Sequence, residues 1–226
     1  MNHLFSDLEA VLFDLDGTLV ETNIDFPLMK REMIRFANDQ GLSSSDLAGL
    51  DILAIVDRMT HHVRHARGES AAEATREQAL LILEEIELRH SADAQEIWPA
   101  RELIRALQGL SIKVGIVTRN CRAASEQSLA RAGIAPDVLL CREDVARTKP
   151  SPEHLLAALE RLSAKPERSL MIGDHPMDAA AGKAARMRTI GLLTKGRSPD
   201  YFASAEPDAV AASLSEILSA LIDSHS

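Results

Sequence analysis

Five short apolar runs, each separated from the next by a longer segment, constrain the fold of this chain most. They are rich in Val, Ile and Leu and span residues 8–13, 111–118, 136–141, 168–173 and 188–193. Continuous apolar runs of this length are typical of parallel strands that helices cover on both faces. We therefore expect an α/β fold built on a parallel sheet.

Helix-like segments lie between these runs. Residues 120–133 begin with a capping-type Asn and end in Gly, and residues 151–162 begin with Ser and place Pro152 at the first helical position. Residues 177–187 are rich in Ala, and residues 213–222 have the spacing of a final amphipathic helix. Asn, Ser and Pro are favoured at helix starts and Gly at helix ends, so we expect strands and helices to alternate through the second half of the chain.

Residues 21–97 interrupt this alternation because they contain no strand-like run. A segment of this length does not stay structureless in a compact domain. Apolar residues recur there at helical spacing in three sets: Phe26, Met29, Met33, Phe36 and Ala37; Ile52, Ile55, Val56, Met59, Val63 and Ala66; Ala79, Ile82, Leu83 and Ile86. We expect a helical cap domain over residues 21–95, inserted into an α/β core domain made of residues 1–20 and 96–226.

Composition and charge exclude several classes of protein. The 226 residues are 46% hydrophobic, which is enough for one core domain with a smaller appendage. A net charge of −9 argues against broad affinity for nucleic acids or anionic membranes. Cys121 and Cys141 stand alone, so neither a disulfide framework nor a zinc site is expected. No leader-like segment or membrane-spanning stretch is evident, which predicts a cytoplasmic protein.

Two carboxylates follow the first apolar run with one residue between them. Asp14 should lie at the carboxyl end of that strand, where open α/β sheets bind their ligands. Residues two apart in an extended segment point to the same side, so Asp14 and Asp16 should face one crevice while Gly17 lets the chain turn away. Two carboxylates this close are tolerated when a cation lies between them or one is protonated. The pair predicts Mg²⁺ binding, proton transfer or both.

Two structural explanations of the acidic pair compete with this functional one. A calcium loop needs ligands at alternating positions, a Gly at the sixth and a Glu at the twelfth, and the sequence Gly-Thr-Leu-Val after Asp16 does not supply them. A solvated acidic turn would explain the pair if it stood alone. Further features of the sequence accompany it and favour a functional site.

These further features lie at or beside predicted strand ends. Thr118 precedes a helix start, where a hydroxyl and N–H groups suit a phosphate oxygen, although an ordinary helix cap would look the same. Lys149 lies in a Pro-stiffened loop and is placed to neutralise an anion, although an isolated lysine is more often a solvated charge. Asp174 follows another strand, and Asp178 lies in the first turn of the next helix, where an acidic residue is favourable in itself.

These four motifs, in this order, resemble those of the haloacid dehalogenase-like hydrolase superfamily. The stretch "DLDGTLV" from Asp14 is similar to its first motif, Thr118 to its second, Lys149 to its third and "GDHPMD" from Gly173 to its fourth. The helical insert lies where that family has its α-helical cap. The tail from Ile190, with a Gly-rich loop, a short "PDAV" strand and a last helix, looks like the phosphoglycolate phosphatase-like branch. The resemblance implies a Rossmann-like sheet flanked by helices.

The resemblance also implies roles for these residues. Asp14 would be the nucleophile that forms an aspartyl phosphate, and Asp16 would protonate the leaving group and then deprotonate water. Mg²⁺ would be held by a carboxylate oxygen of Asp14, the main-chain carbonyl of Asp16, and Asp174. Thr118 and Lys149 would bind phosphate oxygens.

The expected reaction is Mg²⁺-dependent hydrolysis of a small phosphomonoester, with phosphoglycolate a candidate through the branch resemblance only. Dehalogenases of the superfamily lack a second acid such as Asp16, and β-phosphoglucomutase-like members typically carry Glu-Asp where this chain has Gly173-Asp174. His175 and Arg119 depart from the commoner residues at their positions, and we assign Arg119 no role. A phosphomutase, a pyrophosphatase and a catalytically silent regulatory or scaffold protein are the alternatives.

Substrate selectivity is expected to come from the cap, whose closure would expel water. His61, Arg64 and His65 fall on one face of the second predicted cap helix and would grip a substrate carboxylate or second phosphate, although such charged runs are usually solvated. Asp178 is expected to support the metal ligands from behind. The expected partner is a small phosphorylated metabolite, with no nucleic acid or membrane, and the oligomeric state is open between monomer and dimer.

Overall fold

The computed structural model describes residues 1–194 and 196–225. The chain forms two compact units. The sheet unit comprises Met1–Thr22 and Ser91–Ser226, and the helical unit comprises Asn23–His90. No helix among the described residues is long and apolar enough to cross a membrane.

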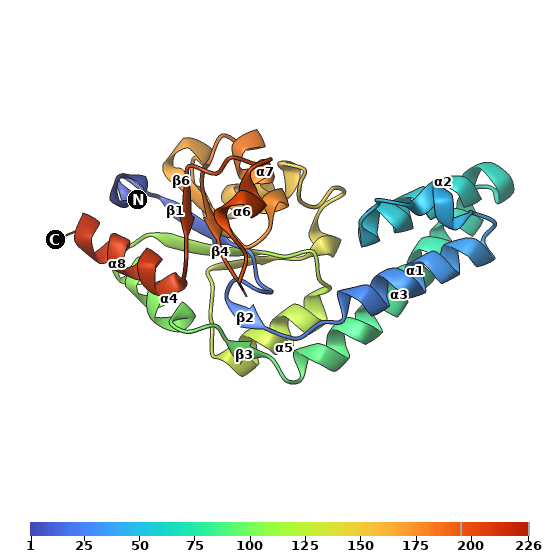
Figure 1. Ribbon diagram of the computed structural model, residues 1–226, viewed down its shortest axis with the longest axis horizontal. Coiled ribbons are helices and arrows are strands. Elements are labelled where there is room, and N and C mark those ends of the chain that lie inside the picture. The colour runs from blue at the N-terminus through green and yellow to red at the C-terminus, as the bar shows by residue number, and fades with distance from the viewer. Residues whose placement is uncertain (195, 226) are drawn as a thin grey trace. The chain divides into compact units, whose positions relative to one another are not determined.

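In the described part of the chain, six parallel strands form the central layer of the sheet unit (Figure 1), which confirms the predicted α/β fold. Their order across the sheet is β5 (Val138–Leu140), β4 (Lys113–Val117), β1 (Ala10–Phe13), β6 (Ser169–Gly173), β7 (Arg188–Leu192) and β8 (Ala209–Ala211). Because β1 pairs with β4 on one side and β6 on the other, the carboxyl ends of these three strands are adjacent at one edge of the sheet. Open α/β sheets bind ligands at such an edge.

Helices cover both faces of this sheet. They are α4 (Ala100–Gly109), α5 (Arg122–Ala132), α6 (Glu153–Leu162), α7 (Pro176–Ala184) and α8 (Leu214–Ser224). Val11 and Phe13 of β1 belong to a buried cluster with α4, α5 and α8, whereas Ala10 and Leu12 belong to a second cluster with α6 and α7. Alternate residues of a strand point to opposite faces, so one continuous apolar run supplies both halves of the core.

The helix that follows β4 starts later than predicted. The N-cap of α5 is Cys121, whose Sγ accepts a hydrogen bond from Ala124 N at 3.4 Å, and not Asn120. The predicted end at Gly133 is confirmed, since Gly133 has a φ of 66°, a left-handed conformation that suits glycine at a helix end. The side chain of Asn120 instead donates to Asp16.

A short antiparallel pair of strands, β2 (Val20–Glu21) and β3 (Gln95–Glu96), lies where the chain leaves and re-enters the sheet unit. Each strand has only two residues, so no apolar run indicates it in the sequence. Next to these strands in the chain, Ile97 N donates to Leu19 O at 2.9 Å. This hydrogen bond extends the pairing between the outgoing and the returning segment by one residue on each side.

The helical unit is formed by α1 (Phe26–Asp39), α2 (Ile52–Arg67) and most of α3 (Glu69–Ser91). Each of the three predicted sets of apolar residues lies in one of these helices, and Met33, Met59 and Leu83 are fully buried in their common core. The carboxylates of Asp25 and Asp51 accept hydrogen bonds from main-chain N–H groups at the starts of α1 and α2. These N-terminal hydrogen bonds fix where α1 and α2 begin.

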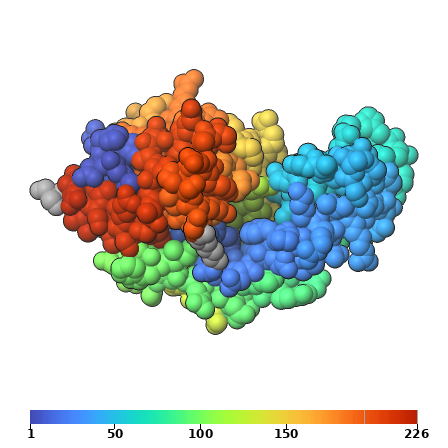
Figure 2. Space-filling view, in the orientation of Figure 1, coloured from blue at the N-terminus to red at the C-terminus, as the bar shows by residue number. Residues whose placement is uncertain are grey.

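The amino-terminal segment packs against the end of the sheet unit that carries α8. Leu4 and Phe5 of the 3₁₀-helix η1 (Asn2–Phe5) are buried in the same cluster as Leu221 of α8. Figure 2 shows the first residues, in blue, directly against the red carboxyl-terminal ones. Arg188 ties the segment to β7 by donating to Leu4 O at 2.9 Å.

Candidate active site

Asp14 directly follows β1 at the edge of the sheet where parallel strands end. Its main-chain N–H donates to Ile172 O of β6 at 2.9 Å, so the strand pairing fixes its position. The side chain keeps 15% of its surface exposed. Burial raises the pKa of Asp14 to about 6, with Lys149 opposing the rise and Asp178 adding to it. The Asp14 carboxylate is thus held at the strand end with part of its surface open to a ligand.

Lys149 lies between two carboxylates. Its Nζ is 2.6 Å from Asp14 Oδ1 and 2.7 Å from Asp178 Oδ1, and its side chain is 1% exposed. Burial alone would lower the pKa of this lysine, but Asp14 and Asp178 outweigh burial and raise it. Lys149 therefore stays charged in the interior, and its interpretation as a solvated surface lysine is wrong.

Asp174 completes a group of three carboxylates. It follows β6, and ligand oxygens of Asp14, Asp174 and Asp178 all lie within 4.8 Å of one another. Burial raises the pKa of Asp174, and the charge of Asp14 raises it further. A Cβ atom at Gly17, which has a φ of 78°, would lie 2.7 Å from Asp174 Oδ2, so only glycine lets the backbone approach this closely. The group offers oxygen ligands to a hard cation.

Asp178 has two contacts that explain its place at the start of α7. One oxygen, Oδ2, accepts a hydrogen bond from His175 N at 3.1 Å, and the other is paired with Lys149. A Cβ atom at Gly173 would collide with this carboxylate. Asp178 therefore caps the helix, as its position in the first turn predicts, and also pairs with Lys149, while its support of metal ligands stays a prediction.

The carboxylate of Asp16 has a different set of partners. Oδ1 accepts a hydrogen bond from Thr22 Oγ1 at 2.5 Å, and Oδ2 accepts one from Asn120 Nδ2 at 2.5 Å. Among the described residues, the group of three carboxylates that could hold a metal does not include it. These two donors, one on each oxygen, fix the orientation of the Asp16 carboxylate. Such a carboxyl group suits proton transfer.

Thr118 lies at the same edge of the sheet, directly after β4. Its N–H donates to Leu140 O at 2.9 Å, and its Oγ1 accepts a hydrogen bond from Asn120 N at 3.2 Å. Because Cys121 caps α5, Thr118 is not the helix cap. The pairing of β1 with β4 and β6 thus brings Thr118, Asp14 and Asp174 to one edge.

The sequence does not indicate three residues that the structure adds to this site. Thr22 and Asn120 hold Asp16, and Arg197 donates from Nη1 to Asp174 O at 2.7 Å and to its Oδ2 at 3.1 Å. Asn120 lies two residues beyond a predicted strand end, and this position is the one feature of the sequence that could have indicated its place in the site. Arg197 belongs to the loop after β7, and nothing local distinguishes it from a solvated arginine.

A model of one protein family matches most of the chain. The family is described as haloacid dehalogenase-like hydrolase, and the match covers residues 8–186. The chain belongs to this family. It is therefore a hydrolase, as the four motifs predict.

Curated relatives of the chain extend over nearly its whole length. Pyrophosphatase PpaX of Bacillus cereus is 32% identical over 215 residues, which cover 93% of this chain and 95% of that protein. Pyrophosphatase PpaX of Oceanobacillus iheyensis is 25% identical over 225 residues, which cover 96% of this chain and 98% of that protein. These relatives are consistent with the family assignment.

Solved structures share the fold at lower identity. A hydrolase from Pseudomonas syringae superposes with a TM-score of 0.66 at 20% identity, over 96% of this chain and 98% of that one. A predicted phosphoglycolate phosphatase from Haemophilus somnus superposes with a TM-score of 0.64 at 19% identity, over 95% and 98%. The haloacid dehalogenase-like fold thus extends over both units of the chain.

The predicted substrate residues lie on α2 in the helical unit and are exposed. The Nε2 atoms of His61 and His65 are 3.2 Å apart. Arg64 instead forms a two-point ion pair with Glu69, from Nε at 2.6 Å and Nη2 at 3.0 Å. The structure therefore brings the two histidines together and engages the arginine elsewhere, and their contact with a substrate stays a prediction.

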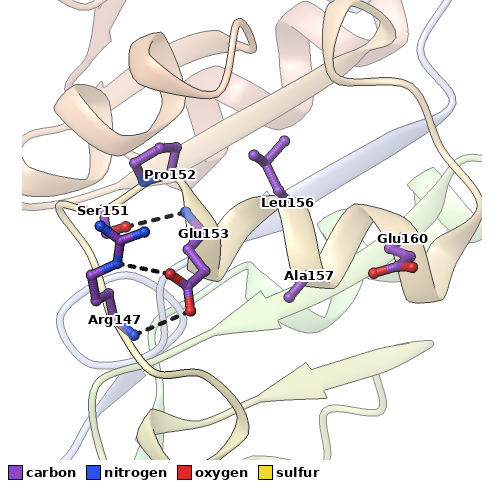
Figure 3. Close-up of a pocket in the computed structure, with 7 residues that line it drawn as sticks. All are labelled: Arg147, Ser151, Pro152, Glu153, Leu156, Ala157 and Glu160. Carbon is purple, nitrogen blue, oxygen red and sulfur yellow. Dashed lines mark hydrogen bonds and ion pairs between the residues drawn. The ribbon is translucent and has the colours of Figure 1, made fainter.

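A surface pocket of about 440 Å³ lies at the start of α6 (Figure 3). It is lined by Arg147, Ser151, Pro152, Glu153, Leu156, Ala157 and Glu160. Arg147 and Glu153 pair across its wall, with Nε 2.9 Å from Oε2. The predicted site residues are not part of this lining, so the pocket is separate from the carboxylate group.

Proposed function

We propose that this enzyme hydrolyses a small phosphomonoester through an aspartyl phosphate on Asp14, with Mg²⁺ as its cofactor. The observation that carries the proposal is the division of the carboxylates between two networks. Asp14, Asp174 and Asp178 have oxygens within 4.8 Å of one another, whereas the two oxygens of Asp16 accept hydrogen bonds from Thr22 and Asn120. One network suits a cation and a nucleophile, and the other suits a proton carrier.

The residues present fit a magnesium ion. Asp14 and Asp174 would hold it through carboxylate oxygens and Asp16 through its main-chain carbonyl, with Asp178 behind them. Mg²⁺ prefers oxygen ligands, and Gly17 leaves the space beside Asp174 open. When bound, the ion would supply positive charge that lowers the repulsion between an anionic nucleophile and a phosphoryl group.

In the first displacement, a carboxylate oxygen of Asp14 attacks phosphorus and the bond from phosphorus to the leaving oxygen breaks. Lys149 restrains the attacking carboxylate through Oδ1. Asp16 donates its proton to the leaving oxygen, and its two hydrogen-bonding partners keep it oriented. The products are an alcohol and an aspartyl phosphate.

In the second displacement, water attacks the phosphorus of the aspartyl phosphate. Asp16, now ionised, takes a proton from this water, and the bond between phosphorus and Asp14 breaks. Inorganic phosphate leaves, and both carboxyl groups return to their starting states. Thr118 and Lys149 are proposed to bind the phosphoryl oxygens, where negative charge is held during transfer.

We also propose that residues 21–95 act as the cap that selects the substrate. His61, Arg64 and His65 are its proposed contacts with a second anionic group on the substrate. Arg64 would exchange Glu69 for that group, which is a modest cost because an exposed ion pair contributes little stability. The proposed place of action is the cytoplasm.

Phosphoglycolate and pyrophosphate are the two compounds to test first. The tail resembles the phosphoglycolate phosphatase-like branch. A curated relative that is 32% identical to this chain is named pyrophosphatase PpaX. Both compounds carry a second anionic group beside the phosphoryl group that is transferred. Pyrophosphate hydrolysis is therefore the second candidate function.

The test is a phosphate-release assay on purified protein, with and without Mg²⁺, over p-nitrophenyl phosphate, phosphoglycolate, pyrophosphate and a wider metabolite panel. We expect release that depends on Mg²⁺, and none from Asp14→Asn or Asp16→Asn. Release that Asp14→Asn leaves intact would contradict the mechanism. A phosphomutase would instead transfer phosphate from a bisphosphorylated sugar, and a silent scaffold would release none from any compound.

A further inference from the structure

Arg197 holds Asp174 with one nitrogen. Its Nη1 donates to the main-chain oxygen of Asp174 at 2.7 Å and to Oδ2 at 3.1 Å. Thr194 Oγ1 donates to the same Oδ2 at 3.3 Å. Because one nitrogen bonds both the main chain and the side chain of a single residue, it limits rotation of that carboxylate.

The guanidinium of Arg197 is itself fixed by the loop that carries it. It lies 4.2 Å from the ring centre of Tyr201, which makes edge contacts with the rings of His175 at 5.9 Å and Phe202 at 5.3 Å. Phe202 is 1% exposed, and a Cβ atom at Gly191 of β7 would lie 2.8 Å from its ring. Phe202 is thus packed against β7, and Tyr201 beside it holds the guanidinium of Arg197.

Lys149 and Arg197 pair with different members of the carboxylate group. Lys149 pairs with Asp14 and Asp178, whereas Arg197 pairs with Asp174. Burial and the charge of Asp14 raise the pKa of Asp174, and Arg197 opposes that rise. Arg197 thus supplies Asp174 with a counter-charge and with two hydrogen bonds.

We infer that Arg197 is a positioning residue, which acts through Asp174 to set the orientation in which that carboxylate binds Mg²⁺. The inference rests on the proposed function. The positive charge of Arg197 opposes a nearby cation, but its removal also frees Asp174 to turn away from the site. Partners that orient metal ligands typically change metal affinity by about 10–100-fold, so we expect loss of orientation to dominate.

The experiment is a calorimetric titration of Mg²⁺ into the enzyme without substrate. We expect Arg197→Met to raise the Kd for Mg²⁺ by about tenfold or more, and Arg197→Lys, which keeps the charge but lacks the planar guanidinium, to recover part of the loss. The matched control is Arg168→Met. Arg168 pairs with Glu9 at 2.8 Å next to the amino ends of β1 and β6, the opposite edge of the sheet, and its loss should leave the Kd unchanged.

A second pair of variants tests the aromatic support. Tyr201→Phe keeps the ring under Arg197 and should bind Mg²⁺ as the wild type does, whereas Tyr201→Leu should bind it more weakly. If Arg197→Met fails to fold, the Kd for Mg²⁺ of these two Tyr201 variants tests the positioning role instead. Equal or tighter Mg²⁺ binding by folded Arg197→Met, or by Tyr201→Leu in its place, overturns the inference.

The outcomes also separate this inference from the proposed function. A wild type that binds Mg²⁺ but releases no phosphate contradicts the proposed function, and the affinity of the variants still decides the role of Arg197. A wild type that binds no Mg²⁺ contradicts both. At saturating Mg²⁺, the positioning role predicts that Arg197→Met recovers most of its kcat while KM for the substrate changes little.

Discussion

The ammonium nitrogen of Lys149 lies 2.6 Å from Oδ1 of Asp14, and the same nitrogen lies 2.7 Å from Oδ1 of Asp178. Lys149 and Asp178 are almost wholly buried, so water does little to screen this arrangement. Lys149 is therefore a shared counter-ion for Asp14 and Asp178 in the folded protein.

Lys149→Met should destabilise the protein and abolish turnover. The substitution leaves Asp14 and Asp178 close together without their shared cation, and removing one partner of a buried ion pair costs about 3–5 kcal/mol. Urea unfolding measures the loss, and Lys183→Met, at an exposed lysine of α7, is the control. The double variant with Asp178→Asn should lose less than the sum of the single variants, because one unpaired charge is removed. A loss below about 1 kcal/mol in Lys149→Met would show that the pair is solvated.

Asn120→Leu should slow catalysis while leaving substrate affinity nearly unchanged. The variant removes the Asn120 donor to Asp16 Oδ2, so the proposed proton carrier loses a hydrogen bond that orients it. Misplacement of a catalytic group by about 1 Å costs on the order of 100-fold, so we expect kcat to fall about 10–100-fold. The measurement is steady-state kinetics on the compound that the phosphate-release assay identifies as a substrate.

Thr22→Val should act in the same direction as Asn120→Leu, since Thr22 holds the other oxygen of Asp16. The control is Thr75→Val, which removes a hydroxyl that donates to Ala71 O within α3. If kcat stays at the wild-type value in both Asn120→Leu and Thr22→Val, the hydrogen bonds to Asp16 have no role in proton transfer.

Local rules in the sequence were enough to predict the part of the site that strand ends create. Asp14, Thr118 and Asp174 each follow an apolar run, and the carboxyl ends of parallel strands meet at one edge whatever the loops do. The need for glycine at position 17 could also be predicted, because a tight turn directly after a strand favours a residue without a side chain.

Contacts between residues far apart in the chain could not be predicted. Asn120 looks like a helix cap because local capping preference takes no account of Asp16, which lies 104 residues earlier and accepts its side-chain hydrogen bond. Cys121 then caps α5, although cysteine is not a favoured cap. Arg197 could not be predicted either, since the residue to which it donates, Asp174, lies 23 positions earlier in the chain.

Gly173→Ala should destabilise the protein although it adds a single methyl group. The new Cβ would collide with the carboxylate of Asp178 and push it away from Lys149. Overpacking in a close-packed interior costs about 1–3 kcal/mol. Gly109→Ala, at the end of α4 where no atom lies within 4 Å of the added Cβ, is the matched control and should be neutral or stabilising by up to about 1 kcal/mol. Equal stability of the two variants would mean that Asp178 relaxes without cost.

The buried imidazole of His154 in α6 should make the protein sensitive to mild acid. Burial lowers the pKa of His154 to about 3, and the charge of Lys149 lowers it further, whereas the unfolded chain has the ordinary value of 6.5. Below pH 6.5 the unfolded state therefore binds the proton more readily, so stability present above pH 6.5 is lost as the pH falls toward 3. At pH 5 this loss is about 2 kcal/mol.

His154→Leu should lack this component of the pH dependence. Urea unfolding at pH 7.5 and pH 5 is expected to show that the wild type loses about 2 kcal/mol more than the variant between the two conditions. Carboxyl groups with raised pKa values, such as Asp14, change stability in the opposite direction over this range, but they are common to both proteins and cancel in the difference. His3→Leu, at an exposed histidine, serves as the control. An equal loss in the wild type and His154→Leu would mean that His154 has the same pKa in the folded and the unfolded chain, which contradicts the prediction.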